Sequence, residues 1–123
     1  MTKEHIQDNG AELLSEIIGA RLSSVQFVMD YLILGFDEKG ALTTLLWPEI
    51  LSAGPTTKFG MPGYRDSLCD LIMKLVENVE ITPEETIIIG FSRDVRLAIP
   101  LRTYKRPGER AIFTTPTNRL FAW

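Results

Sequence analysis

The sequence predicts an α+β fold in which two copies of a helix–strand–strand–strand unit build antiparallel sheet. Each half opens with an amphipathic helical stripe, each continues with apolar runs separated by short turns, and the two halves correspond position by position. The predicted copies are residues 10–48 and 64–102, joined by a loop at 48–63 and followed by an extension at 103–123. A chain of 123 residues suits a single domain with its own core.

The first half begins with a helix-capping pattern, because Asn9 is followed three residues later by Glu12. An apolar stripe and a terminating glycine then predict a helix at about 9–18. Val25, Phe27 and Met29 alternate with neighbouring residues, as in a half-buried strand. Two further strands follow, a wholly apolar one at 31–36 and another at 41–47 that Pro48 ends.

The segment 48–63 carries three prolines and three glycines and predicts an irregular loop of the long kind that often serves function. The second half starts with a helix at about 64–74, whose apolar residues recur at helical spacing. Strands are predicted at about 75–82, 86–91 and 95–101. The short apolar pieces 111–113 and 120–123 are candidates for added edge strands.

The two halves align at an offset of 54 residues, which becomes 55 after one insertion. Leu14 then matches Leu68, and Phe36 matches Phe91. Two unrelated units remain the alternative, because apolar residues coincide by chance in any amphipathic chain. The expected core consists of Leu14, Ile17, Ile18, Val25, Phe27, Leu34, Phe36, Leu68, Leu71, Ile72, Val79, Ile88 and Leu97.

The charge of the chain is unevenly distributed. Residues 1–90 hold 6 Lys/Arg and 14 Asp/Glu, a balance of −8, whereas residues 91–123 hold 7 Lys/Arg and 2 Asp/Glu, a balance of +5. The basic tail either closes against acidic surface of the same domain or meets a charged partner, since such fields speed and orient association.

Residues for the common catalytic chemistries are missing. His5 is the single histidine, which argues against Ser-His-Asp and Cys-His catalysis, and one histidine with one cysteine cannot build a structural zinc site. We expect Cys69 to be buried in the core, and a lone cysteine fits a reducing, cytoplasmic compartment. No apolar run approaches the ~20 residues of a membrane span, and no nucleotide-binding motif occurs. We therefore expect no enzyme, no cofactor, no metal and no membrane partner.

Two surfaces are candidates for binding. Apolar anchors at the end of the long loop, Phe59, Met61 and Tyr64, predict an exposed edge for a protein partner. The tail mixes basic and aromatic residues, as grooves for single-stranded nucleic acid do. The candidate residues of that second choice are Arg102, Tyr104, Lys105, Arg106 and Arg110.

The run DYLILGF, the strand closed by Trp-Pro and the helix GYRDSLCDLI resemble small uncharacterised bacterial proteins. Some small folds of this kind are similar to immunity proteins that neutralise the toxins of competing bacteria. The resemblance covers roughly residues 10–102 and includes no active-site motif. It implies a non-catalytic, bacterial, protein-binding module, and the acidic first 90 residues suit a toxin with a basic surface.

Overall fold

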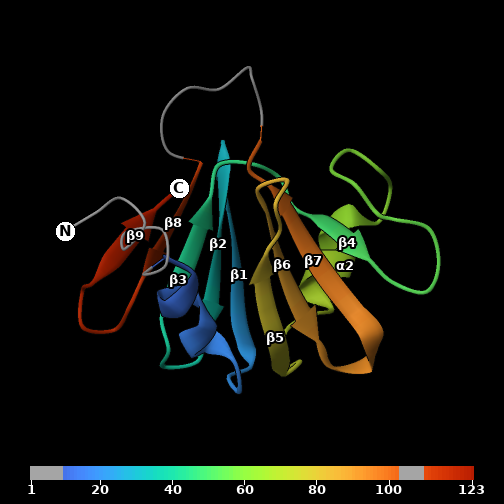
Figure 1. The fold of residues 1–123 in the computed structure, drawn as a ribbon. Coiled ribbons are helices and arrows are strands. Elements are labelled where there is room, and N and C mark those ends of the chain that lie inside the picture. The colour runs from blue at the N-terminus through green and yellow to red at the C-terminus, as the bar shows by residue number, and fades with distance from the viewer. Residues whose placement is uncertain (1–9, 103–109) are drawn as a thin grey trace.

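The computed structural model describes residues 10–102 and 110–123. In this part of the chain, short helical segments accompany two antiparallel sheets, drawn in Figure 1. One sheet has five strands in the order β1-β2-β3-β8-β9, and the other has four in the order β4-β7-β6-β5. The fold is mostly β with some helix, so the predicted combination of antiparallel sheet and helix is confirmed, with less helix than expected.

The five-stranded sheet draws its strands from both ends of the chain. They are β1 (Leu22–Val28), β2 (Tyr31–Phe36), β3 (Ala41–Thr44), β8 (Ala111–Thr114) and β9 (Leu120–Ala122). The four-stranded sheet comes from the middle of the chain. Its strands are β4 (Glu49–Leu51), β5 (Val76–Ile81), β6 (Thr86–Phe91) and β7 (Val95–Pro100).

The helices are shorter than predicted. Residues 10–14 are α-helical and continue into the 3-10 turn η1 (Ser15–Ile17), while α2 spans Tyr64–Cys69. A second 3-10 turn, η2 (Ser92–Asp94), connects β6 to β7. The backbone turns left-handed shortly after each helical segment, at Gly19 with φ 91° after η1 and at Met73 with φ 80° after α2. Asn9, the predicted cap, lies outside the described residues.

The prediction that 48–63 is irregular throughout is wrong. Ile50 lies in β4 opposite Leu97 of β7, and an isolated bridge joins Ile50 to Thr57 on its other side. Ile50 is buried, with 5% of its surface exposed, while its neighbours in β4 are half-buried. Three residues are too few for a periodic signal in the sequence, so tertiary packing decides this strand.

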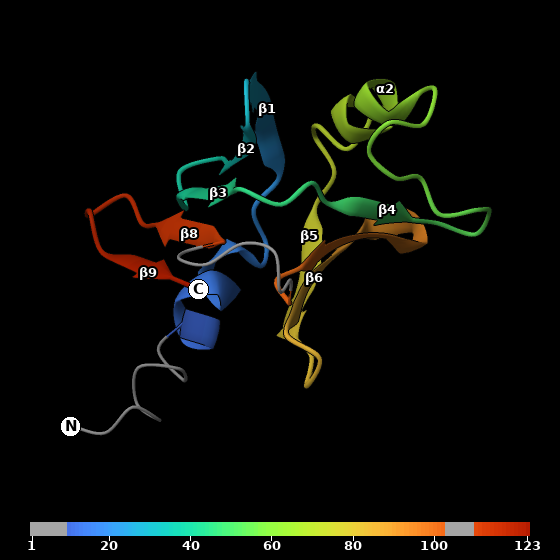
Figure 2. The same ribbon diagram turned by 90° about the horizontal axis from the view of Figure 1, so that it is seen from above.

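Each sheet receives its fourth strand from the other half of the chain. The strand that follows β3, β4, pairs with β7, and the strand that follows β7, β8, pairs with β3. The helical segments are exchanged too, because α2 packs beside β1 and η1 packs beside β5. Figure 2 shows the two sheets side by side, with the chain passing between them after β3.

The two sheets meet through a reciprocal set of backbone hydrogen bonds. The Gly19 N–H donates to the Val76 carbonyl at 2.9 Å, and the Met73 N–H donates to the Leu22 carbonyl at 2.7 Å. The donors Gly19 and Met73 are 54 residues apart, and so are the acceptors Leu22 and Val76, so each bond is the counterpart of the other with the two halves exchanged. Two more bonds behave in the same way, from Leu22 N–H to Lys74 at 3.1 Å and from Val76 N–H to Ala20 at 2.8 Å.

Both first strands carry an irregularity at the same place. The register shifts between Leu22 and Ser24 in β1 and between Val76 and Asn78 in β5. Gly35 pairs with Ser24, and Gly90 pairs with Asn78. A Cβ at either glycine would collide with the end of its partner's side chain unless that side chain moved, so glycine favours this close approach.

One hydrophobic core contains residues from both halves. The prediction of burial is confirmed for Leu14, Ile17, Leu34, Phe36, Leu68, Leu71 and Leu97. Val25, Ile72, Val79 and Ile88 are half-buried instead.

Three predictions of burial are wrong. Ile18 is 43% exposed because it comes after the last turn of η1, beside the junction of the sheets. Phe27 is 37% exposed because it lies near the end of β1, where the Arg65 guanidinium lies 5.9 Å from the ring centroid. Cys69 is exposed because it ends α2 on the side away from Leu68.

Candidate protein-binding surface

Exposed apolar side chains gather at the end of β1 and in the loop before α2. We define the aromatic patch as Phe27, Met29, Trp47, Phe59 and Met61. Met29 is 90% exposed, Phe59 55% and Met61 42%, so three large apolar groups of this patch reach solvent. The sequence prediction of Phe59 and Met61 as exposed anchors is confirmed as far as their exposure is concerned.

Stacked rings hold the patch in shape. The Trp47 and Phe59 ring centroids are 4.5 Å apart with an interplanar angle of 11°. Phe59 also meets Tyr64 edge-on, with centroids 5.8 Å apart and an angle of 89°. Such offset and edge-to-face arrangements are favourable for aromatic rings. Phe59 is therefore fixed between two rings although more than half of its surface is exposed.

Tyr64 lies beneath the patch, contrary to the prediction that it forms an exposed edge. Its side chain is 3% exposed, and its hydroxyl donates to the Pro48 carbonyl at 2.5 Å. Burial, and secondly the charge of Glu49, raise the pKa of Tyr64 well above its usual range. Tyr64 is the first residue of α2, so its bond to Pro48 ties the start of the helix to the segment between β3 and β4.

Charged groups border the patch and two shallow hollows open into it. One hollow of about 330 Å³ runs along Phe59 and Met61 to Arg65 and Asp66, and one of about 290 Å³ lies among Phe27, Trp47, Phe59 and Arg65. Arg65 lines both hollows and covers the Phe27 ring. The result is an apolar centre with a polar rim, the arrangement found at interfaces.

The basic tail does not form one exposed patch. Arg102 is exposed, but Arg110 is only half-exposed and turned inward, with its Nη1 donating to the Leu101 carbonyl at 2.8 Å and its Nε buried. The nucleic-acid alternative would require these two side chains to point into solvent together, and Arg110 does not do so. Tyr104, Lys105 and Arg106 lie outside the described residues.

Three members of the aromatic patch were not among the predicted site residues. Trp47 was placed in a strand, Phe27 in the core and Met29 at a strand end. Met29 next to the turn residue Asp30 was the one signal available, since a large apolar side chain at a turn is seldom covered. The meeting of β1 with the loop before α2 could not be read from local sequence.

The described residues show no group of three or more His, Cys, Asp or Glu side chains placed to hold a metal ion. No helix in this part of the chain is long and apolar enough to cross a membrane. Comparisons with known proteins find no matching family model, no similar curated protein and no similar solved structure.

Proposed function

We propose that this chain is a non-catalytic module that binds another protein through the aromatic patch. The exposed side chains of Met29, Phe59 and Met61 carry the proposal. Apolar groups that remain exposed on a folded protein in one contiguous place are typical of interaction sites. The stacking on Trp47 holds Phe59 in place before binding, which lowers the entropy lost when a partner covers it.

A protein suits this surface better than a small molecule. The two hollows are shallow and share their lining residues, whereas the exposed anchors stand between them. Small ligands are usually enclosed on most of their surface, while protein partners cover a few anchors within a polar rim.

The specific form that we favour is an immunity-type role, in which the partner is a toxin domain with a basic surface. The patch belongs to residues 1–90, whose charge balance of −8 would attract such a partner and speed association. The proposal places the protein in the bacterial cytoplasm, since the lone Cys69 is a free thiol.

Affinity capture with matched variants tests the binding surface. Wild-type chain should retain from its source cells a protein that Phe59→Ser with Met61→Ser loses. Leu120→Ser is the control, because Leu120 is 61% exposed on β9, away from the patch. Capture of the same proteins by all three chains would contradict the proposal.

The immunity role has its own test. Production of the wild-type chain should restore growth of cells that express the toxin gene adjacent to its own gene, and the Phe59/Met61 double variant should not restore it. Restoration by the double variant would place the neutralising surface elsewhere.

Single-stranded nucleic acid is the alternative, and the inward position of Arg110 speaks against it. A labelled strand of about 20 nucleotides, titrated at low salt, should show no micromolar binding. Salt-sensitive binding that Arg102→Ala with Arg106→Ala abolishes would overturn the proposed protein-binding role.

We also infer that the chain arose by internal duplication. Three observations support this: the recurring order of helical turns and three strands, the exchanged hydrogen bonds of residues 19–22 and 73–76, and the paired irregularities opposite Gly35 and Gly90. Unrelated units have no reason to share all three. Matched substitutions in the two halves should then have matched effects.

A further inference from the structure

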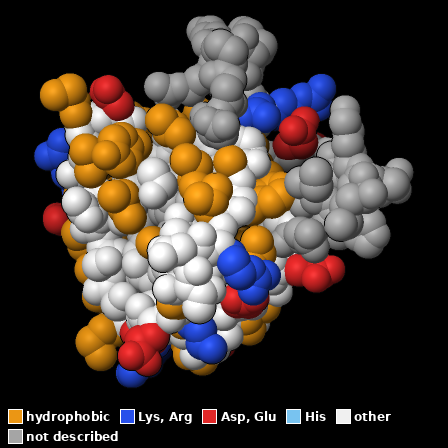
Figure 3. Space-filling model, turned by 90° about the vertical axis from the view of Figure 1, so that its left-hand side faces the viewer, with side chains coloured by type: hydrophobic (Ala, Val, Ile, Leu, Met, Phe, Trp, Pro, Cys, Tyr) orange, Lys and Arg blue, Asp and Glu red, His pale blue; other side chains and the backbone are white. Residues whose placement is uncertain are grey.

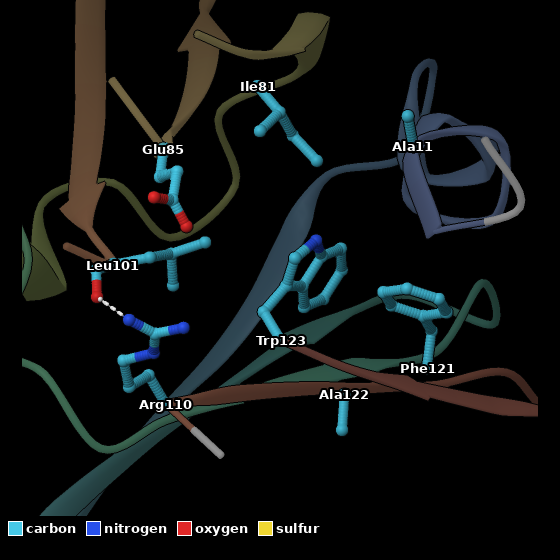
Figure 4. A pocket seen from close by; sticks show the side chains of 8 residues that line it. All are labelled: Ala11, Ile81, Glu85, Leu101, Arg110, Phe121, Ala122 and Trp123. Atoms are coloured by element: carbon cyan, nitrogen blue, oxygen red, sulfur yellow. Dashed lines mark hydrogen bonds between the residues drawn. The ribbon is translucent and has the colours of Figure 1, made fainter. Parts of the chain in front are cut away.

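A cavity of about 430 Å³ opens where residues of both sheets meet the first helical segment. Most of its wall is apolar and comes from five separate parts of the chain (Figure 4). The lining residues are Ala11, Ile81, Glu85, Leu101, Arg110, Phe121, Ala122 and Trp123. Its size lies within the range of about 300–1,000 Å³ that is usual for small-molecule sites.

The backbone at Arg110 is held on both sides. Its N–H donates to the Trp123 carbonyl at 2.7 Å, and its carbonyl accepts from the Leu45 N–H at 2.8 Å. The Trp123 N–H donates in turn to the Ala111 carbonyl at 2.9 Å, which continues the pairing of β8 with β9. Arg110 and Trp123 therefore reach the cavity from neighbouring, hydrogen-bonded positions.

The guanidinium of Arg110 is only partly satisfied. Nη1 donates to the Leu101 carbonyl at 2.8 Å, but Nε is buried and has no hydrogen-bond partner. Within the described part of the chain, Arg110 makes no ion pair, although Glu85 lines the same cavity. Nη2 is not buried and makes no hydrogen bond within the described residues, so it is the part of the guanidinium that an acceptor in the cavity can reach, and a charged acceptor gains a strong bond there.

The free part of the guanidinium is a donor for a carboxylate. Nη2 carries two N–H groups and shares the positive charge, so it can donate to a carboxylate oxygen in the cavity, whereas Nε is enclosed by protein. In Figure 4 the side of the guanidinium away from Leu101 is turned toward the Trp123 ring. An anion bound there would lie against aromatic surface.

The apolar wall defines the rest of the ligand. Phe121 and Trp123 meet edge-on, with ring centroids 5.0 Å apart and an angle of 66°. Leu101 and Ile81 face them across the cavity in Figure 4. Figure 3, which views the molecule from the side of β8 and β9, shows further hydrophobic side chains at the surface of this face. Glu85 adds a negative charge at the cavity, which disfavours a ligand with two carboxylates.

We propose that this cavity binds a small organic monocarboxylate with a flat apolar body, held by Nη2 of Arg110 and packed against Trp123 and Phe121. This site is separate from the aromatic patch, and its existence does not depend on the proposed protein-binding function. The same chemistry is presented by a free aromatic acid and by the C-terminal carboxylate of a peptide that ends in an aromatic residue.

The test is a titration of the full chain followed by NMR, with benzoate, its uncharged analogue benzamide, and N-acetylphenylalanine as a mimic of a peptide end. Benzoate should shift the Arg110 Nε–H and Trp123 indole N–H signals and saturate below about 10 mM. Benzamide should bind at least about tenfold more weakly, since it lacks the charge. Tighter binding of N-acetylphenylalanine than of benzoate would identify a peptide end as the natural source, and the reverse order a free acid.

Matched variants separate binding from folding. Arg110→Met should weaken benzoate binding at least about tenfold, and Arg110→Lys should restore little, because an ammonium lacks the planar pair of donors. Arg119→Met is the control, since Arg119 is exposed and lies outside the cavity lining. Ala11→Trp, at an exposed helical position, should block the cavity and leave the thermal midpoint unchanged.

Three results would overturn the proposal: no saturable shift with benzoate, equal binding of benzamide, or unchanged affinity in a folded Arg110→Met or Ala11→Trp variant. The NMR signals of Trp123 and Arg110 report where the ligand binds. Binding that shifts only the signals of other residues therefore also contradicts the proposed site.

Discussion

The aromatic patch and the cavity occupy corresponding corners of the two halves, yet one is filled and the other is open. Phe27 of the patch corresponds to Ile81 of the cavity, and Arg65 corresponds to Ala11, each pair 54 residues apart. Strand pairing extends the comparison to β4 and β8. Ile50 of β4 lies opposite Leu97, and Phe113 of β8 lies opposite Leu42, the counterpart of Leu97 in the first half. Ile50 therefore corresponds to Phe113, and Trp47, three residues before Ile50, corresponds to Arg110.

The difference between the corners lies in which side chains supply the rings. In the first corner, Trp47 stacks on Phe59 and Tyr64 fills the space beneath. In the second, glycine stands at position 10, the counterpart of Tyr64, and a Cβ there would come within 2.5 Å of the Phe121 ring. The frame is the same, so a few substitutions decide whether a corner presents rings outward or leaves a cavity lined by a half-exposed arginine.

The largest expected effect tests the frame that both corners share. Leu71→Ala and Ile17→Ala remove fully enclosed side chains at corresponding positions, and each should lower the free energy of unfolding by about 2–5 kcal/mol. Denaturant titration measures both. Met73→Ala, at a residue that is 70% exposed, should change stability by less than about 0.5 kcal/mol. A loss below about 1 kcal/mol for only one of the two core variants would break the correspondence.

The paired irregularities give a sharper test. Gly35→Ala and Gly90→Ala should each destabilise by about 1–3 kcal/mol, because the new methyl group collides with Ser24 or Asn78. Adding Ser24→Ala to the first variant and Asn78→Ala to the second should recover most of the loss, as a double-mutant cycle would show. Recovery in one half alone would mean that the two glycines have different roles.

Tyr64 distinguishes the filled corner from the open one. Tyr64→Phe removes the bond to the Pro48 carbonyl and should lower the free energy of unfolding by about 1 kcal/mol at neutral pH. Because the pKa of Tyr64 is raised in the folded state, its contribution is complete below about pH 10, the usual pKa of tyrosine, and is lost as the pH rises further. Tyr64→Phe should therefore show a smaller fall in stability above that pH than wild type; an identical fall would contradict the burial of the hydroxyl.

The smallest effect concerns the charged residue over the patch. Arg65→Met should cost about 0.5 kcal/mol, since an exposed cation over a ring contributes little. Ala11→Met at the corresponding position of the other half should leave thermal stability within about 0.5 kcal/mol of wild type. A loss above about 2 kcal/mol for Arg65→Met would show that Arg65 holds α2 in place.

Strong local patterns predicted much of the fold. The strands at 31–36 and 86–91 lie where the sequence placed them, because wholly apolar runs between turns have few alternatives. The second helix was predicted too long, since its apolar stripe continues beyond Cys69 toward Met73, where the backbone turns left-handed, whereas the first ends close to its predicted end before Gly19. Of these two left-handed positions, only Gly19 can be recognised from the sequence, because glycine adopts this conformation readily whereas nothing near a methionine indicates it.

The sites were harder to predict than the strands. Phe59 and Met61 were identified because the loop before α2 has large apolar residues among prolines and glycines. The cavity was missed because its wall joins residues 11, 81, 101 and 123, which only the exchange of strands brings together. Arg110 was noticed for its charge alone, whereas the bond that turns it inward depends on Leu101.

The exchange of strands also bears on how the chain folds during its synthesis. All strands of the four-stranded sheet have been made once Pro100 has left the ribosome, so that sheet can close early. The free edge of β3 must wait for β8, at Ala111–Thr114, and meanwhile offers unpaired backbone groups to any other chain. The five-stranded sheet is therefore the part of a newly made chain that is most exposed to wrong pairing.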